Sequence, residues 1–331
     1  MNYNESALPD RNATTTSSYS TVHWIREIGR GVKGARSLSY SEANELFNAI
    51  ILGKVGDLEL GAILIAMRIK GESVDEIGGF LAAAQSSFPL LVVPTLDCAP
   101  IVIPSYNGAR RVANLTPLLA MLLARAGAPV LVHGVTEDAG RVTSAEIFQA
   151  LGILPVCSHQ EAEQQLQQGL PVFMPIEILA PRLAQLLALR KKLGLRNSTH
   201  TLVKILQPFE QPALRLTSYT HPEYALMLTD FFSGSEDADR GDVLLMRGTE
   251  GETVANTRKG QQIDWFHDGL KTTLAEIQTA SDSTLSIPID AKGTAQWIET
   301  VMSGHEPVPH KIAEQVRHCM MAAGRNRGGA V

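Results

Sequence analysis

Hydrophobic residues recur with two different periods along the chain. Between about residues 20 and 90 they fall at every third or fourth position, which predicts a small bundle of amphipathic helices. We expect Ser41 to cap one of these helices, and Ser73 another, because Ser73 and Glu76 have the spacing of a capping box. The apolar faces exceed what one small bundle needs, as the side chains of Leu46, Phe47, Ile50, Leu60, Leu64 and Met67 illustrate.

After residue 100, short β-branched runs alternate with longer apolar segments. We expect buried strands within 101–103, 129–134, 171–175, 213–218 and 242–246, with helices between them. Strands that alternate with helices are typical of a parallel sheet. The pattern therefore predicts an α/β protein, with a small N-terminal helical bundle and a large α/β domain around a mostly parallel central sheet.

The same pattern divides the chain into four parts. Residues 1–19 are polar and rich in Ser, Thr and Asn, so we expect a disordered tail. The helical domain covers residues 20–90, and we expect a helix at 178–194 to join it in space. The α/β domain covers residues 91–320, and residues 321–331 are expected to form a flexible tail.

Composition narrows the class of protein. The chain has 331 residues, of which 44% are hydrophobic and 19% charged, as in an ordinary globular protein. It has no run of 18 apolar residues and no charged-then-apolar leader, so we expect a cytoplasmic protein without a membrane partner. The three cysteines are widely separated, which favours reduced thiols over a metal site.

The distribution of charge is more informative than the net charge of −5. Residues 98–136 contain three arginines and no acid, and residues 178–209 contain six basic residues and no acid. Two such segments can form a basic face on a mildly acidic protein. The alternatives are that charges of both signs cover the surface evenly, and that Arg190, Lys191 and Lys192 merely complement the dipole at a helix C-terminus.

Several short motifs resemble those of the anthranilate phosphoribosyltransferase and nucleoside phosphorylase family, glycosyltransferase family 3. Asn114 and Thr116 match the family's Asn-x-Ser/Thr helix start, and His133 and Gly134 match the loop after its second strand. The resemblance implies the family's fold and a homodimer formed through the N-terminal helices. It also implies that both acid-free segments build one cleft, with Arg196 at the position of an arginine that contacts the aromatic acid substrate.

Other motifs of the family are missing. Its Gly-Thr-Gly-Gly-Asp loop is replaced by residues 104–107, its lysine by Val132, and its adjacent Asp-Glu pair by Thr253 and Val254. Glu250 and Glu252 lie nearby, but their spacing does not reproduce an adjacent pair. Since a diphosphate leaving group usually needs Mg²⁺ held on carboxylates, we expect no metal and no other cofactor, and Mg²⁺ only if the chain is a transferase.

No other catalytic motif is present, and we expect no catalytic residue; GxSxG, Walker, GxGxxG and HExxH sequences are all missing. The stretches Pro-Ser-Tyr-Asn-Gly-Ala-Arg and Arg-Asn-Ser-x-His-Thr-Leu resemble the YbiB-type branch of the family. That branch is associated with DNA binding and lacks transferase activity.

The sequence therefore predicts a homodimeric protein that binds DNA or RNA through phosphate contacts in a basic groove, without sequence preference. The alternatives are a phosphoribosyltransferase or nucleoside phosphorylase with a degenerate diphosphate and Mg²⁺ site, and a scaffold for protein partners. The expected phosphate-binding residues are Tyr106, Asn107, Arg110, Arg111, Asn114, Thr116, His133, Arg190, Lys191, Lys192, Arg196, His200 and Lys204.

Overall fold

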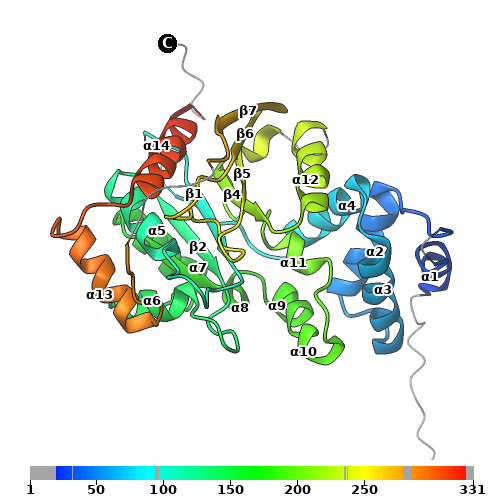
Figure 1. The fold of residues 1–331 in the computed structure, drawn as a ribbon. Coiled ribbons are helices and arrows are strands. Elements are labelled where there is room, and N and C mark those ends of the chain that lie inside the picture. Colours follow the sequence, from blue (N-terminus) through cyan, green and yellow to red (C-terminus); the bar gives the residue numbers. More distant parts are fainter. Residues whose placement is uncertain are drawn as a thin grey trace, which may run out of the picture.

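Four helices at the start of the chain pack together on one side of the molecule (Figure 1). They are α1 (Val22–Ile28), α2 (Tyr40–Ile51), α3 (Asp57–Lys70) and α4 (Val74–Gln85). The computed structural model describes residues 20–31, 33–93, 97–234, 236, 238–278 and 285–325, so the tail expected at 1–19 lies outside the described residues. The predicted helical bundle is confirmed.

Capping boxes set where two of these helices begin. Ser73 accepts a hydrogen bond from the N–H of Glu76, and the Glu76 side chain accepts one from the Ser73 N–H, as predicted. The prediction for Ser41 was wrong, because α2 begins two residues earlier. Ser39 is its N-cap, since Glu42 completes the reciprocal pair of bonds there.

The α/β domain is built on a seven-stranded sheet in the order β3-β2-β1-β4-β5-β6-β7. The strands are β1 (Ile101–Ser105), β2 (Val130–Gly134), β3 (Val172–Pro175), β4 (Leu214–Tyr219), β5 (Val243–Arg247), β6 (Ile263–His267) and β7 (Leu270–Ala275). The first five are mutually parallel, and β6 and β7 form an antiparallel hairpin at one edge. The predicted fold class is confirmed.

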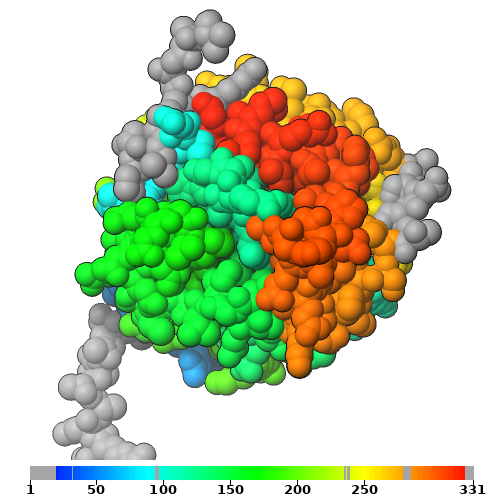
Figure 2. Space-filling view, turned by 90° about the vertical axis from the view of Figure 1, so that its left-hand side faces the viewer, coloured from blue at the N-terminus to red at the C-terminus, as the bar shows by residue number. Residues whose placement is uncertain are grey.

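Helices cover both faces of this sheet. One face packs against the N-terminal helices together with α8 (Ile176–Leu179), α9 (Pro181–Ala188), α11 (Thr199–Leu202) and α12 (Pro222–Gly234). The other face packs against α5 (Thr116–Arg125), α6 (Ser144–Ala150), α13 (Ala291–Met302) and α14 (His310–Arg325). Figure 2 shows this outer layer, with α14 in red beside α13 in orange. The polar helix α7 (His159–Gln167) packs against β3.

Two expected boundaries are corrected by the structure. The helix expected at 178–194 is three short helices, α8, α9 and α10 (Arg190–Leu193), because Pro181 begins a new helix after Ala180 leaves helical geometry. The tail expected from residue 321 is helical to Arg325. Ala322 and Ala323 are buried, and the carbonyl of Ala323 accepts a bond from the Ala99 N–H.

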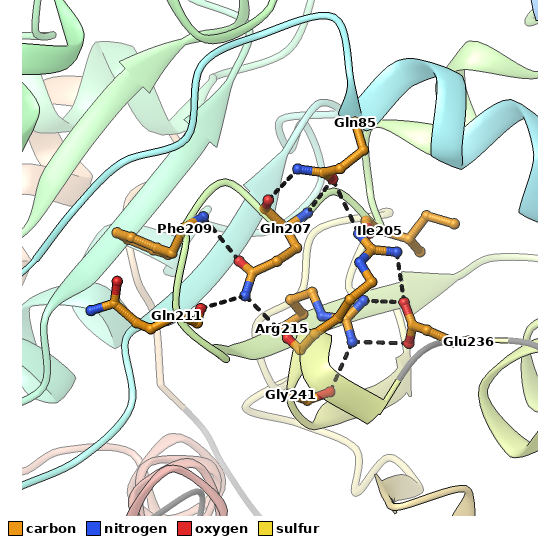
Figure 3. Close-up of polar contacts among 9 residues, drawn as sticks. Gln85, Ile205, Gln207, Phe209, Gln211, Arg215, Glu236 and Gly241 are labelled. Atoms are coloured by element: carbon orange, nitrogen blue, oxygen red, sulfur yellow. Dashed lines mark hydrogen bonds and ion pairs between the residues drawn. The ribbon is translucent and has the colours of Figure 1, made fainter.

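A polar network ties the end of α4 to the segment that follows α11 (Figure 3). Gln85 exchanges hydrogen bonds with the backbone of Gln207, and Arg240 donates to the Gln85 amide oxygen over 3.1 Å. The Glu236 carboxylate accepts a hydrogen bond from Arg240 over 2.8 Å, and each of its oxygens accepts one from the guanidinium of Arg215. The network fixes the backbone that leads from α11 into β4.

None of the helices in the described part of the chain has the length and apolar composition needed to span a membrane.

Candidate functional site

A cleft of about 410 Å³ lies where the sheet meets the helical domain. In the sheet order, β1 lies between β2 and β4. The connection from β1 therefore runs to one side of the sheet, and the connection from β3 to β4 runs to the other side of β1. The crevice at such a switch point is the usual ligand site of an open parallel sheet. Its lining includes Arg68, Asn107, Arg141, Arg190, Arg196, His200, Lys204, Ser218, Tyr219, His221, Tyr224 and Glu250.

Four of the cations that line the cleft contact neutral groups. Arg196 donates to the Asn107 side-chain oxygen over 2.5 Å, and Arg68 donates to the Tyr224 hydroxyl over 2.9 Å. Arg141 donates to two backbone carbonyls, and the Lys204 ammonium donates to the Gly251 carbonyl over 3.1 Å.

Among the described residues, no carboxylate oxygen lies within 4.0 Å of the charged groups of Arg68, Arg141, Arg196 or Lys204. Arg190 has a half-exposed contact with Asp138 at 3.5 Å. The cleft therefore holds positive charge that the protein itself does not neutralise by direct pairing.

Burial, and to a smaller extent neighbouring cations, shift the pKa values of the groups that line the cleft. Burial lowers the pKa of Lys204 to about 8, against the attraction of Glu252 and with a further lowering from Arg196. Burial, Arg190 and Arg141 lower the pKa of Arg196. Burial and Arg196 lower the pKa of His200 to about 3, so this imidazole is neutral at pH 7. An anion in the cleft would relieve the repulsion among these cations.

The structure brings five of the expected site residues together at the cleft: Asn107, Arg190, Arg196, His200 and Lys204. Tyr106 and His133 are buried instead, and the Tyr106 hydroxyl lies 2.7 Å from His133 Nδ1. Burial lowers the pKa of His133 to about 3 and raises that of Tyr106. Neither residue lines the cleft.

Asn114 and Thr116 are also buried and do not line the cleft. The Asn114 amide donates to Ser144 Oγ over 3.1 Å and to the Val142 carbonyl, and its oxygen accepts from the Thr116 N–H. These contacts hold the start of α5 against the start of α6. Asn114 therefore has internal hydrogen-bond partners, and the Thr116 side chain is buried away from the cleft lining.

Four expected residues lie at the surface outside the cleft. Arg110 and Arg111 are exposed, and Arg111 lines a separate hollow of about 50 Å³. Lys191 and Lys192 are exposed on α10, beside Arg190 but not in the cleft lining. They can extend the basic surface but do not form the cleft.

The side chains that line the cleft and that sequence reasoning missed include Arg68, Arg141, Tyr219, His221 and Tyr224. Arg68 comes from α3 of the helical domain, in a segment that carries charges of both signs. Tyr219 ends β4, and the other two aromatic residues lie just after it. The position at a strand end was a usable signal for Tyr219, whereas nothing local marked Arg68.

The carboxylates of Glu250 and Glu252 contact backbone groups of the loop after β1. Among the described residues, no group of three or more His, Cys, Asp or Glu side chains is placed to hold a metal ion. Glu250 and Glu252, which the sequence suggested as possible ligands, face backbone N–H groups. Glu252 Oε1 accepts from the N–H groups of Asn107 and Gly108 at 2.8 and 2.7 Å.

Comparison with known proteins agrees with this architecture. Residues 22–88 match the family described as glycosyl transferase family, helical bundle domain. The chain is 45% identical over 302 residues to YbiB of Escherichia coli K12, a protein named as uncharacterized, with coverage of 91% of this chain and 93% of that one. It is 32% identical over 190 residues to an anthranilate phosphoribosyltransferase of Saccharolobus solfataricus, covering 57% and 52% of the two chains.

Solved structures show the same fold at lower identity. The anthranilate phosphoribosyltransferase of Thermus thermophilus superposes with a TM-score of 0.68 at 21% identity, covering 90% of this chain and 89% of that one. The Saccharomyces cerevisiae enzyme in complex with PRPP and Mg gives a TM-score of 0.64 at 13% identity, covering 92% of each chain. The protein thus has the anthranilate phosphoribosyltransferase fold of glycosyltransferase family 3, as its motifs predicted. Within it, the chain belongs to the same family as E. coli YbiB.

Proposed function

We propose that this protein binds nucleic acid without catalysis, and that a strand enters the cleft between the helical domain and the sheet. The observation that supports this most directly is the set of lining cations without a carboxylate partner: Arg68, Arg141, Arg196 and Lys204. Lys and Arg side chains that neutralise backbone phosphates bind any sequence. The resemblance to a DNA-binding branch of the family points in the same direction.

The dimensions and the lining of the cleft favour a single strand over a duplex. A volume of about 410 Å³ lies in the usual range for small-molecule sites, about 300 to 1,000 Å³, which admits a nucleotide unit but not a base-paired helix. Tyr219, His221 and Tyr224 supply aromatic rings at the same cleft. Aromatic rings stack on bases of every kind, so they add affinity without adding sequence preference.

The alternative is an active phosphoribosyltransferase, which the fold and the sequence identity to anthranilate phosphoribosyltransferases support. Glu250, which lines the cleft, and Glu252 accept hydrogen bonds from four backbone N–H groups. We therefore propose that the protein uses no cofactor. Mg²⁺-dependent transfer from phosphoribosyl diphosphate to anthranilate at about 1 s⁻¹, an ordinary enzymatic rate, would instead establish the transferase.

We also propose that the protein is a homodimer, formed through α1 and α3. The apolar side chains first expected at the interface are largely internal, since Leu46, Phe47 and Met67 are buried in the bundle. A separate apolar pocket of about 630 Å³ lies between α1 and α3, with Leu58 and Ile69 at its wall, 88% and 61% exposed. We expect Leu58→Lys to halve the mass measured by light scattering. A measured mass of 35.8 kDa for the wild-type protein, which is the mass of one chain, would contradict the proposal.

A salt series with labelled oligonucleotides tests the nucleic-acid proposal. We expect the single strand to bind more tightly than the duplex of the same sequence, with affinity falling by a log–log slope of about 0.7 per phosphate contacted. Changing the sequence of the strand should leave affinity nearly unchanged. Absence of binding to either form at low salt would refute the proposal.

Matched variants assign that binding to the cleft. Arg68→Gln/Arg196→Gln removes two lining charges, whereas Arg258→Gln/Arg317→Gln removes two exposed charges outside the cleft lining. We expect the first pair to weaken binding about 100-fold, at roughly 1.4 kcal/mol for each lost phosphate contact, and to make the salt slope shallower by about 1.4. Equal affinities for the two variants would place the binding surface elsewhere.

A further inference from the structure

Lys204 differs in chemistry from the other cations of the cleft. Among the described residues, the lining contains four arginines and a single lysine. A guanidinium keeps its proton at any pH at which a protein stays folded, whereas an ammonium that loses its proton becomes an amine with a free electron pair. Lys204 is therefore the cleft cation that can act as a nucleophile.

The contacts of Lys204 do little to hold its proton. Its ammonium donates to the Gly251 carbonyl over 3.1 Å, and this is its only hydrogen bond to the described residues. The same oxygen also accepts from Asn107 at 2.7 Å and from Ser218 Oγ at 3.0 Å. Since an ammonium has three N–H groups, two of them have no partner in the described part of the protein.

Lys70 shows the opposite arrangement. Its side chain is 8% exposed and contacts the Glu76 carboxylate at 2.6 Å, and such a partner favours the protonated form of a lysine. Lys204 has no carboxylate oxygen within 4.0 Å among the described residues, and burial together with Arg196 lowers its pKa to about 8. About a tenth of the Lys204 side chains are thus neutral at pH 7, against about 0.04% for a lysine with the ordinary pKa of about 10.4.

We infer that Lys204 captures an aldehyde that carries phosphate, by forming a reversible imine at its Nζ atom. The electron pair of the neutral amine attacks the carbonyl carbon, so a C–N bond forms and the carbonyl oxygen becomes a hydroxyl. Both amine hydrogens then leave with that oxygen as one water molecule, and no oxidant or further reactant is needed. The Ser218 hydroxyl, which shares the Gly251 carbonyl with Lys204, is placed to relay the proton.

The arginines of the cleft favour an aldehyde next to phosphate, because they supply positive charge without a carboxylate partner. Two molecules have this chemistry: a free sugar phosphate, and an abasic site in a nucleic-acid strand, where the sugar opens to an aldehyde between two phosphates. For the strand, the inference rests on the proposed function; for the sugar phosphate it does not. Capture is stoichiometric, so it agrees with a protein that turns over no substrate.

A single-stranded oligonucleotide with one abasic site tests capture from a strand. Sodium borohydride reduces an imine to a stable amine, so we expect one covalent adduct that peptide mass spectrometry assigns to Lys204. Lys204→Arg keeps the charge and should bind the strand, but should give at least about tenfold less adduct, because a guanidinium is never neutral. Lys292→Arg, exposed on α13 outside the cleft lining, is the matched control and should form the adduct as the wild type does.

Ribose 5-phosphate is the probe for a free sugar phosphate. With borohydride added at each pH, labelling of Lys204 should level off above about pH 8. Labelling of exposed lysines should keep rising towards their ordinary pKa of about 10.4. Labelling of Lys204 by this probe alone would assign the capture to free sugar phosphates.

The two probes separate this inference from the proposed function. Labelling of exposed lysines in preference to Lys204 with both probes would overturn the inference, and this result comes from the wild-type protein without any variant. In that case, an oligonucleotide that binds without an adduct would leave the nucleic-acid proposal intact. If no strand binds, the nucleic-acid proposal fails, and ribose 5-phosphate still decides the inference.

Discussion

Arginines in two regions of this protein have opposite electrostatic surroundings. In the network of Figure 3, Arg215 has a side chain that is 1% exposed and contacts Glu236 at two points, and Arg240 shares the same carboxylate. In the cleft, Arg68 and Arg196 contact a hydroxyl and an amide oxygen. The first region supplies a carboxylate in direct contact with its arginines, whereas Arg68 and Arg196 have no such contact among the described residues.

The difference separates structural from functional cations. A buried charge is tolerated when a carboxylate and carbonyls satisfy it, and such a pair fixes the surrounding backbone. Burial is the main cause of the lowered pKa values of Arg196 and Lys204, and repulsion between neighbouring cations adds to it: Arg190 and Arg141 act on Arg196, and Arg196 acts on Lys204. We interpret that unrelieved repulsion as the sign of an external polyanion, and the four predictions below test this interpretation.

The largest effect is expected from Glu236→Ala. The substitution leaves Arg215 buried without its partner, so we expect the free energy of unfolding to fall by about 3 to 5 kcal/mol. Urea denaturation measures the change. Glu314→Ala, which breaks the more exposed contact with Lys311, should cost at most about 1 kcal/mol, and comparable losses for the two would mean that Glu236 has no special role.

A carboxylate placed among the cleft cations should give them the counter-charge that Glu236 gives Arg215 and Arg240. Thr201 lines the cleft, so Thr201→Glu adds a negative charge among its cations. We expect nucleic-acid affinity to fall about tenfold, or roughly 1.4 kcal/mol. The uncharged variant Thr201→Gln is the matched control, and an equal loss in both variants would show that shape, not charge, is responsible.

The pKa of Lys204 predicts a dependence of binding on pH. Because that pKa is about 8, the ammonium loses its proton as pH rises through 8, and we expect affinity for nucleic acid to fall several-fold between about pH 7 and 9. Over the window from about 8 to 10.5 the unfolded chain holds this proton and the folded chain does not, so Lys204 makes stability rise with pH there.

Lys204→Arg separates these effects, since a guanidinium stays charged throughout. Binding curves for this variant should be flat over the same range of pH, and its stability should lose the rise above pH 8. The same pH dependence in wild type and variant would exclude Lys204 as its source.

The smallest effect is expected from Lys191→Ala/Lys192→Ala. Both lysines are exposed on α10 outside the cleft lining, so we expect a loss of affinity of about twofold, roughly 0.4 kcal/mol, for every sequence alike. The change in the free energy of unfolding should be a few tenths of a kcal/mol. A tenfold loss of affinity would move the main binding surface from the cleft to α10.

Local patterns in the sequence determined the helical bundle, the five parallel strands and the capping box at Ser73, because each depends on residues a few positions apart. The hairpin of β6 and β7 carried a local signal that was missed. Asp268 and Gly269 have φ 48° and 73°, and Asp-Gly is the typical sequence of such a two-residue turn. Of the two acid-free segments, 178–209 supplies Arg190, Arg196 and Lys204 to the cleft, whereas no arginine of 98–136 lines it.

Only the tertiary structure decided which polar residues face the cleft and which satisfy one another. His133 and Asn114 match family motifs, yet the packing of α5, α6 and the strand ends buries both against internal partners. Arg68 approaches from α3, more than 100 residues before the sheet residues that it joins. Glu252 reaches a loop 144 residues earlier in the chain. Contacts of this kind depend on how distant segments pack, and local sequence periodicity does not encode that packing.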